Sequence, residues 1–279
     1  MKKVTKNLFN LNNSKIIIAG GAGFLGSQFS LALANAGATA IILDINNKSL
    51  NLLKNKFKKR GQKGNFFLVD LNDENKVNMT VNSIIKKYKK IDCLINAASL
   101  TGDSMLKINK DFFKGFEKYD FKLWQKSLNA NLASTFIVTQ SVANYMLKRK
   151  KGSIINIASD VGVISPDNRI YEANKKFNYK GVNFNTPISY AVAKSGIISM
   201  TRYLATRWAK RGIRVNCISP AGVYKGHEKK FVEQLSQRIP LGRMAKPHEL
   251  NGAIIYLCSN ASSFVTGHNL IVDGGRTIW

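Results

Sequence analysis

The apolar residues of this chain fall into seven short runs that alternate with longer stretches of helical pattern from one end to the other. This alternation is typical of parallel strands joined by crossover helices. Because helices cover both faces of a parallel sheet, its strands are apolar along their whole length, as these runs are. We therefore expect an α/β fold with a doubly wound seven-stranded parallel sheet and helices on both faces.

The strands are expected at residues 15–20, 39–44, 65–70, 91–96, 153–159, 213–219 and 269–273. The helices are expected at residues 23–36, 48–60, 73–88, 121–148, 189–211 and 247–259. No linker rich in proline, glycine or serine and no internal repeat divides the 279 residues. We therefore expect a single domain that spans residues 1–279.

Two stretches, residues 99–119 and 165–187, do not fit the alternation. The second is polar and carries Tyr171, Phe177, Tyr179 and Phe184. Both follow the expected carboxyl ends of strands, where ligands bind in sheets of this kind. We expect them to be substrate loops, and surface decoration is the other interpretation of the same pattern.

Composition limits the classes of protein that remain. Hydrophobic residues make up 44% of the chain and charged residues 21%, as in a soluble globular protein, and no apolar run approaches the roughly 18 residues that span a bilayer. The three cysteines and the three histidines lie far apart, without the spacing of a metal site or a disulfide framework. We expect no metal, no membrane association and a reducing, cytoplasmic location.

The formal net charge is +27, which suits binding to nucleic acid, a membrane surface or an acidic partner. The positive residues are scattered, however, and the excess of lysine and asparagine is a bias that AT-rich genomes produce. No basic stretch interleaved with aromatic residues is present. A solvated lysine surface is therefore the favoured interpretation, an anionic substrate or acidic partner the second, and nucleic acid the third.

Gly20, Gly23 and Gly26 stand in the sequence IIIAGGAGFLGS, between the first expected strand and the first expected helix. Glycine at such a turn lets the backbone approach the pyrophosphate of a dinucleotide, which binds the N-terminus of the helix. Asp44 ends the next strand, and its carboxylate can accept hydrogen bonds from a ribose 2′-hydroxyl but would repel a 2′-phosphate. The sequence therefore predicts NAD rather than NADP, and a structural cap before Asn46 is the other interpretation of Asp44.

The sequence SYAVAKSG places Tyr190 and Lys194 four residues apart, on one face of an expected helix. A nearby ammonium lowers the pKa of a phenol from about 10 towards the working range, so Tyr190 could act as a general acid and base. Tyr171 and Lys175 form a second pair with the same spacing. The spacing alone therefore does not identify the catalytic tyrosine.

Taken with motifs further along the chain, these residues resemble the short-chain dehydrogenase/reductase family. The resemblance runs from about Lys15 to Gly275. It rests on GGAGFLG, Asp70-Leu71, INAA, Asn131 in NANLASTF, Ser159 in IINIASDVG, the pair Tyr190 and Lys194, RVNCISPAG and GHNLIVDGG, in the family's order. It implies a Rossmann fold and an oxidoreductase that interconverts a secondary alcohol and a ketone with a nicotinamide cofactor, NAD.

The resemblance also implies a role for each matching residue. Tyr190 would be the acid and base, and Lys194 would tune it and hold the nicotinamide ribose. Ser159 would hydrogen-bond the reacting oxygen, and Asn131 would hold a water that connects Lys194 to solvent. The residues implied to contact the cofactor are Gly20, Gly21, Gly23, Phe24, Leu25, Gly26, Asp44, Ile45, Asp70, Leu71, Asn96, Ala97, Ala98, Tyr190, Lys194, Pro220, Gly222 and Val223.

The two candidate tyrosines differ in their place along the chain and in the sequence after each of them. Tyr171 lies 12 residues after Ser159, near the family's usual gap, whereas Tyr190 lies 31 residues after it. A long helical pattern follows Tyr190 and leads into RVNCISP, but an asparagine- and glycine-rich stretch that cannot sustain a helix follows Tyr171. We predict that Tyr190 is the acid and base, and that about residues 165–187 are an insertion near the active site.

The glycine turn has Phe24 where the compact branch of the family has its second glycine, a pattern shared with the longer nucleotide-sugar epimerases and dehydratases. Those need an extra C-terminal substrate domain, and this chain ends at VDGGRTIW. We therefore expect the compact branch and, by resemblance, a homodimer or homotetramer. Its interface would involve the Tyr190 helix and the long helix that carries Trp124, Tyr145 and Met146.

Within the family the sequence looks most similar to oxidoreductases of bacterial surface-sugar and flagellin-modification clusters, which supply nonulosonic sugars. This implies a phosphorylated or nucleotide-linked sugar, which basic residues would attract. The basic residues near the expected site are Lys175, Lys176, Lys180, Lys225, Lys229 and Lys230. One alternative is a 3-oxoacyl-carrier-protein reductase that uses NADPH, against which Asp44 argues. The other is a non-catalytic cofactor-binding or basic nucleic-acid-binding protein.

Overall fold

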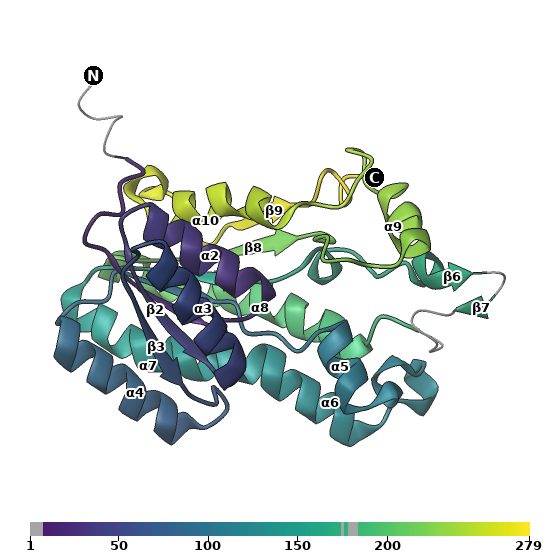
Figure 1. Ribbon diagram of the computed structural model, residues 1–279, viewed down its shortest axis with the longest axis horizontal. Helices are drawn as coiled ribbons and strands as arrows, with labels where there is room; N and C mark the ends of the chain where they lie inside the picture. Colours follow the sequence, from purple (N-terminus) through teal and green to yellow (C-terminus); the bar gives the residue numbers. More distant parts are fainter. Residues whose placement is uncertain (1–7, 174–175, 178–183) are drawn as a thin grey trace.

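The computed structural model describes residues 8–173, 176–177 and 184–279 of the chain. Seven parallel strands form one sheet in the order β3-β2-β1-β4-β5-β8-β9, which confirms the expected fold (Figure 1). The strands are β1 (Lys15–Ala19), β2 (Thr39–Asp44), β3 (Gly64–Leu68), β4 (Cys93–Asn96), β5 (Gly152–Ile157), β8 (Ile213–Pro220) and β9 (Asn269–Val272). The strand order reverses between β1 and β4, so a cleft opens there at the carboxyl ends of the strands.

The apolar strands fold this way because both of their faces are covered. Every residue of β2 is buried. On one face of the sheet, Ile16 and Ile18 of β1 pack in a core with α2 (Phe24–Asn35), α3 (Asn47–Lys59) and α10 (Asn251–Cys258). On the other face, Ile17 packs with residues of α4 (Glu74–Tyr88), α7 (Ser134–Arg149) and α8 (Ile188–Trp208). In Figure 1, α2 and α10 lie above the strands and α4 and α7 lie below them.

The helix expected at residues 121–148 is not continuous. It consists of α6 (Phe121–Leu128), a π-helical turn (Asn129–Ala133) and α7. A π-helical turn inserts one extra residue into a helix and is frequent at functional sites. The interruption therefore draws attention to the residues that it carries, and Asn131 is one of them.

The stretch of residues 99–119, expected as a loop, contains α5 (Gly102–Ile108) and two short 3₁₀ turns. The helix α9 (Lys229–Ser236) was not expected either. The described part of residues 165–187 includes the short antiparallel strands β6 (Glu172–Ala173) and β7 (Lys176–Phe177). No described helix has the length and apolar character needed to cross a membrane.

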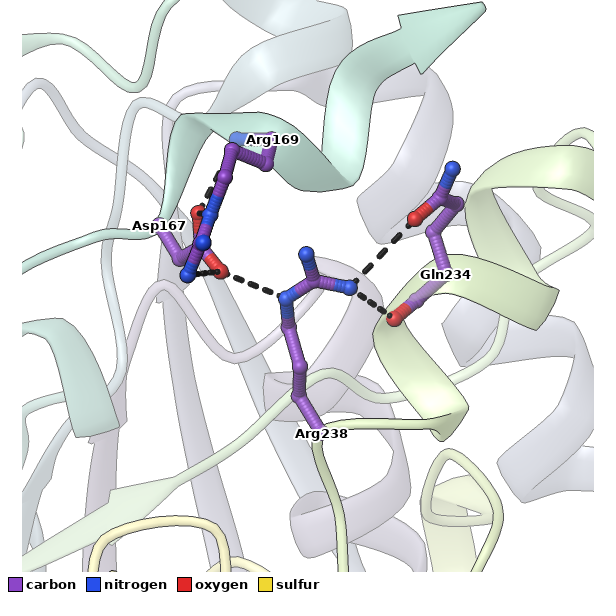
Figure 2. A network of polar contacts seen from close by, with 4 residues as sticks. All are labelled: Asp167, Arg169, Gln234 and Arg238. Carbon is purple, nitrogen blue, oxygen red and sulfur yellow. Dashed lines mark hydrogen bonds and ion pairs between the residues drawn. The ribbon is translucent and has the colours of Figure 1, made fainter.

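A polar network ties residues 167–169 to α9 and the turn after it (Figure 2). The carboxylate of Asp167 accepts hydrogen bonds from Arg169 Nε at 2.8 Å and from Arg238 Nε at 2.5 Å. Arg238 Nη1 also donates to the main-chain oxygen of Gln234 at 2.8 Å. Hydrogen bonding to Arg169 and then to Arg238 holds the pKa of Asp167 well below its ordinary value. This network connects α9 to the stretch that we expected to be an insertion.

Candidate active site

A cleft of about 1160 Å³ opens at the carboxyl ends of the strands. This exceeds the roughly 300–1,000 Å³ of an ordinary small-molecule site. The residues expected to contact a cofactor that line it are Gly20, Gly23, Phe24, Leu25, Asp44, Ile45, Asp70, Leu71, Ala97, Ala98, Tyr190, Lys194, Pro220, Gly222 and Val223. Both stretches expected to be substrate loops also contribute to the wall, for example with Met105 and Tyr171.

The turn between β1 and α2 requires glycine at two positions. Gly20 has a φ of +72°, and a Cβ there would lie 2.4 Å from Ala98 Cα. A Cβ on Gly26 would lie 2.1 Å from the carbonyl oxygen of Gly20. Gly23 precedes α2, whose N-terminus has no side-chain cap and no acidic residue in its first turn. The first turn of α2 therefore offers its main-chain N–H groups at the cleft, an arrangement that suits the phosphates of a dinucleotide.

Asp44 stabilises this turn as well as lining the cleft. Its Oδ2 accepts a hydrogen bond from Ala22 N at 3.0 Å, and its Oδ1 accepts one from Asn46 N at 2.9 Å. Asp44 therefore fixes the main chain before α3, whose N-cap is Asn46, and it also lines the cleft. The residues that line this end of the cleft are Asp44, Ile45, Asn46, Asp70, Leu71 and Asn72, and none of them is basic.

Three residues expected to contact the cofactor lie outside the cleft wall. Gly21 and Gly26 belong to the turn but do not line the cleft. Asn96 is 3% exposed, and its Nδ2 donates to Thr139 Oγ1 and to Asn156 Oδ1, both at 2.8 Å. The side chain of Asn96 therefore links β4 to α7 and β5, because the last residue of a buried strand points into the core here.

Tyr190 and Lys194 lie on the same side of the first turns of α8, as their spacing predicts. The ammonium of Lys194 is 5.5 Å from the centre of the Tyr190 ring and donates a hydrogen bond to the main-chain oxygen of Ile157 at 2.9 Å. Lys194 is only 1% exposed, so this contact fixes its position at the end of β5. Both side chains line the cleft.

The pKa values correct one expectation from the sequence. Burial raises the pKa of Tyr190 to about 12, although hydrogen bonds with Ser159 and Ser99 act in the opposite direction. Burial also lowers the pKa of Lys194 to about 8. The prediction that Lys194 lowers the pKa of Tyr190 is therefore wrong for the chain by itself. Desolvation is the largest cause of both shifts.

Ser159 follows β5 and is part of a buried polar chain. Its Oγ donates a hydrogen bond to Asp160 Oδ1 at 2.8 Å, and Val161 N donates to the same oxygen at 2.8 Å. Asp160 Oδ2 accepts a hydrogen bond from Arg276 Nη1 in an ion pair whose side chains are 5% and 6% exposed. Ser159, Asp160 and Arg276 all line the cleft next to Tyr190.

Asn131 lies in the π-helical turn and is fully buried. Its Oδ1 accepts hydrogen bonds from Ser99 Oγ at 2.7 Å and Leu100 N at 2.9 Å. Its Nδ2 donates to the main-chain oxygens of Leu100 and Ser127, at 3.1 and 3.0 Å. The side chain thus fixes the segment after β4, and a water at Asn131 that connects Lys194 to solvent stays a prediction.

Tyr171, the other candidate tyrosine, lies in the same cleft. Its ring stacks on Phe231 with centroids 5.4 Å apart and contacts Phe184 at 4.3 Å, and its hydroxyl is 3.3 Å from Thr186 Oγ1. Burial raises its pKa to about 12. The lysine spaced four residues after it, Lys175, lies outside the described residues. Tyr171 therefore belongs to an aromatic wall, formed with Phe184 and Phe231, that reaches α9.

Sequence reasoning missed Ser99, Asp160 and Arg276. Ser99 follows INAA directly and Asp160 follows Ser159, so their neighbours in sequence could have indicated them. Arg276 lies 116 residues from Asp160, and no pattern in the sequence links the two. Among the described residues, no group of three or more His, Cys, Asp or Glu could hold a metal ion.

The lysines expected near the site are only partly placed there. Lys225 lines the cleft, whereas Lys229 and Lys230, at the start of α9, do not. Lys175, Lys180 and the side chain of Lys176 lie outside the described residues. Other basic residues, Lys122, Lys126 and Arg276, line the cleft instead.

Comparisons with known proteins agree along nearly the whole chain. A family model described as short chain dehydrogenase matches residues 14–236. The chain is 32% identical over 272 residues to the 3-oxoacyl-[acyl-carrier-protein] reductase of Thermotoga maritima, covering 96% of this chain and 99% of that protein. It is 30% identical over 275 residues to the NAD-dependent glycerol dehydrogenase of Listeria innocua, covering 97% of this chain and 96% of that protein.

A solved structure shares the whole fold. A gluconate 5-dehydrogenase from Burkholderia cenocepacia, in complex with NADP and tartrate, superposes with a TM-score of 0.84 at 26% identity. The superposition covers 99% of each chain. The similarity therefore includes the cleft as well as the sheet.

Proposed function

The chain belongs to the short-chain dehydrogenase family of oxidoreductases, which act on alcohol or ketone groups with a nicotinamide cofactor, and we propose that it is an NAD-dependent member acting on a sugar or sugar-derived substrate. One observation carries the proposal. Ser159, Tyr190 and Lys194 meet in a cleft whose other end is formed by the glycine turn and Asp44. Hydride transfer needs this combination of a dinucleotide site and a proton donor.

A bound nicotinamide cofactor supplies the hydride acceptor for alcohol oxidation and the hydride donor for ketone reduction. Tyr190 exchanges a proton with the oxygen of the substrate. With a pKa of about 12 its phenol is protonated at neutral pH, ready to donate to a carbonyl oxygen. Lys194, with a pKa of about 8, can gain or lose a proton near neutral pH and stabilises the phenolate when it is charged.

The preference for NAD rests on the end of the cleft formed by Asp44. The carboxylate is held in place by two main-chain N–H groups, and the six residues that line this end include Asp70 but no basic residue. A 2′-phosphate bound there would lie beside like charge, whereas a 2′-hydroxyl could donate to Asp44. The NAD-dependent glycerol dehydrogenase of Listeria innocua is a relative with this preference, and the gluconate 5-dehydrogenase complex contains NADP.

An anionic sugar suits the basic residues of the cleft. Lys122 and Lys126 of α6 line it and would attract a carboxylate or phosphate, whereas Arg276 is already paired with Asp160. Relatives named for glycerol and gluconate act on polyols or sugar acids. We propose an anionic sugar derivative, phosphorylated or linked to a nucleotide, with residues 165–187 as an insertion that borders it.

A second candidate, 3-oxoacyl-carrier-protein reductase, is favoured by the 32% identity to the enzyme of Thermotoga maritima. Reduction of acetoacetyl-CoA, a small 3-oxoacyl thioester, with NADPH would support it. Oxidation or reduction within a panel of amino sugars, phosphosugars and nucleotide sugars with NAD(H) would support the first. A chain that turns over only the thioester, with NADPH, contradicts the proposed sugar activity.

We also propose a homodimer or homotetramer. The helices α6, α7 and α8 expose large apolar side chains, among them Phe121 (69% exposed), Phe136 (53%) and Tyr203 (64%). Large apolar side chains left exposed on these helices support a surface that another copy covers. Light scattering after size-exclusion chromatography tests this, since a monomer at micromolar concentration would contradict it.

A further inference from the structure

Lys225 and Asp103 form an ion pair between two chain segments that border the cleft. Nζ of Lys225 lies 2.7 Å from Asp103 Oδ2. Asp103 belongs to the first turn of α5, in the segment after β4, and Lys225 belongs to the loop after β8. Both residues line the cleft, so the pair is part of the wall around a bound dinucleotide.

The ammonium of Lys225 also lies beside the glycine turn. Nζ is 5.8 Å from the centre of the Phe24 ring, and Phe24 is the first residue of α2. The loop is fixed at its base, because Val223 pairs with Ala245 and Tyr224 N donates to the oxygen of Ala245 at 2.8 Å. Because the base of the loop is fixed, the ammonium of Lys225 stays close to the glycine turn.

Two positive features therefore lie close together at this point. One is the ammonium of Lys225, and the other is the N-terminus of α2, which has no side-chain cap and no acidic residue in its first turn. Asp103 compensates the lysine in the structure. A diphosphate brings two negative charges, and it is the group of a dinucleotide that binds at such a turn.

We propose that Lys225 binds the diphosphate of the nicotinamide cofactor and that Asp103 is the counter-ion from which the lysine separates when the cofactor binds. The inference rests on the proposed function only in requiring that the cleft binds a nicotinamide dinucleotide. It assigns to Lys225 a contact with the cofactor that does not depend on which substrate is turned over.

The exchange of partners is energetically accessible because the ion pair is partly exposed. The side chains of Lys225 and Asp103 are 28% and 36% exposed, so solvent screens their attraction. After separation, water can still reach the carboxylate of Asp103, because its side chain is partly exposed. In place of the screened pair, a phosphate oxygen offers the ammonium another charge-assisted hydrogen bond, beside the N-terminus of α2.

The test is a calorimetric titration of the full chain with NADH, with ADP-ribose, which has the diphosphate but no nicotinamide, and with adenosine, which has neither. Lys225→Met removes the cation and keeps an apolar stem, and Asp103→Asn keeps the shape but removes the counter-charge. The matched control is Lys229→Met, which changes the net charge equally. The side chain of Lys229 is 91% exposed and does not line the cleft.

We expect Lys225→Met to raise the Kd of NADH and of ADP-ribose about tenfold and to leave that of adenosine unchanged. Asp103→Asn lowers the Kd for NADH and ADP-ribose about threefold, because the lysine no longer has to leave a carboxylate. Lys229→Met changes neither Kd by more than about twofold. The affinity of Lys225→Met also depends less on salt between about 50 and 250 mM than that of the unmodified chain.

Two results overturn the inference. If Lys225→Met binds ADP-ribose as tightly as the unmodified chain does, the lysine does not contact the diphosphate. If Asp103→Asn weakens binding as much as Lys225→Met does, the ion pair itself shapes the cleft and no exchange takes place. A chain that binds none of NADH, NADPH and ADP-ribose contradicts the proposed function instead. Thermal denaturation of each variant shows that a change in Kd is not a loss of folding.

Discussion

The hydroxyl of Ser159 donates a hydrogen bond to the carboxylate of Asp160 at 2.8 Å, so the serine proposed to hold the reacting oxygen is itself held by a buried anion. Arg276 compensates that anion from the far end of the chain. The position of the Ser159 hydroxyl next to Tyr190 is therefore fixed by Asp160. Burial is the main cause of the raised pKa of Tyr190, and the carboxylate of Asp160 adds to it.

Removal of Asp160 alone leaves the guanidinium of Arg276 buried without its counter-ion. Because the pair is only about one-twentieth exposed, we expect Asp160→Ala to lower the free energy of unfolding by about 3 kcal/mol or more. The double variant Asp160→Leu, Arg276→Met replaces both charges by apolar groups and regains most of this loss. Urea denaturation at fixed protein concentration measures both. Equal destabilisation by the single and double variants would contradict the charge argument.

The choice between the two tyrosines is tested by removing each hydroxyl. Tyr190→Phe takes away the proposed proton donor, so turnover of a substrate found in the sugar panel falls about 100-fold or more. Tyr171→Phe loses a long contact of 3.3 Å to Thr186 and keeps its stacking on Phe231, so turnover stays within about threefold. Steady-state kinetics with NAD measures both. The reverse ranking would assign the chemistry to Tyr171.

Lys194 gives the stability of the cofactor-free chain a pH dependence of defined sign. Its pKa is about 8 in the folded chain, whereas an unfolded lysine has a pKa of about 10.4. Between these values the unfolded chain binds a proton that the folded chain does not, so the free energy of unfolding rises with pH, by about 3 kcal/mol in all. The Lys194→Met variant has no lysine at this position, so its free energy of unfolding does not show this rise with pH.

Unfolding free energies of the unmodified chain and of Lys194→Met, measured from about pH 7 to about pH 10, separate this effect from other titrations. The difference between the two proteins shifts in favour of the unmodified chain as the pH rises. A difference that stays constant with pH would mean that Lys194 keeps an ordinary pKa despite its burial.

The network around Asp167 (Figure 2) is expected to hold α9, which carries Phe231, against Tyr171. Asp167→Asn removes the charge that pairs with Arg238, so hydrogen exchange of residues 229–236 becomes faster, while global stability falls by no more than about 1 kcal/mol. Because the pKa of Asp167 is depressed, its contribution is complete above about pH 4 and is lost as the pH falls further. Glu249→Gln, which breaks an arginine pair elsewhere, is the control.

The sequence predicted the parts of the fold that local patterns determine. The strand Thr39–Asp44 is buried along its whole length, so a continuous apolar run identified it. The glycine pattern identified Gly20 and Gly26, and the structure shows why glycine stands there, since the turn has no room for a Cβ at either position. Tyr190 and Lys194 were brought together by helical spacing alone.

The remaining features depend on contacts that no local pattern encodes. The ion pair of Asp160 and Arg276 joins residues 116 positions apart, and α5, with seven residues, is too short to give a helical period. The pKa of Tyr190 follows from burial, which the sequence does not report, so the effect of Lys194 was overestimated. The π-helical turn at Asn131 interrupts a pattern that reads as one helix.

The central claim is an oxidoreductase site that prefers NAD(H) because of Asp44. It is tested most directly by titrating the chain with NADH and with NADPH, followed by nucleotide fluorescence, at about 50 and about 250 mM salt. The account predicts a Kd for NADH about tenfold or more below that for NADPH at both salt concentrations. Equal or tighter binding of NADPH at the higher salt, where non-specific attraction to the basic surface is screened, would contradict it.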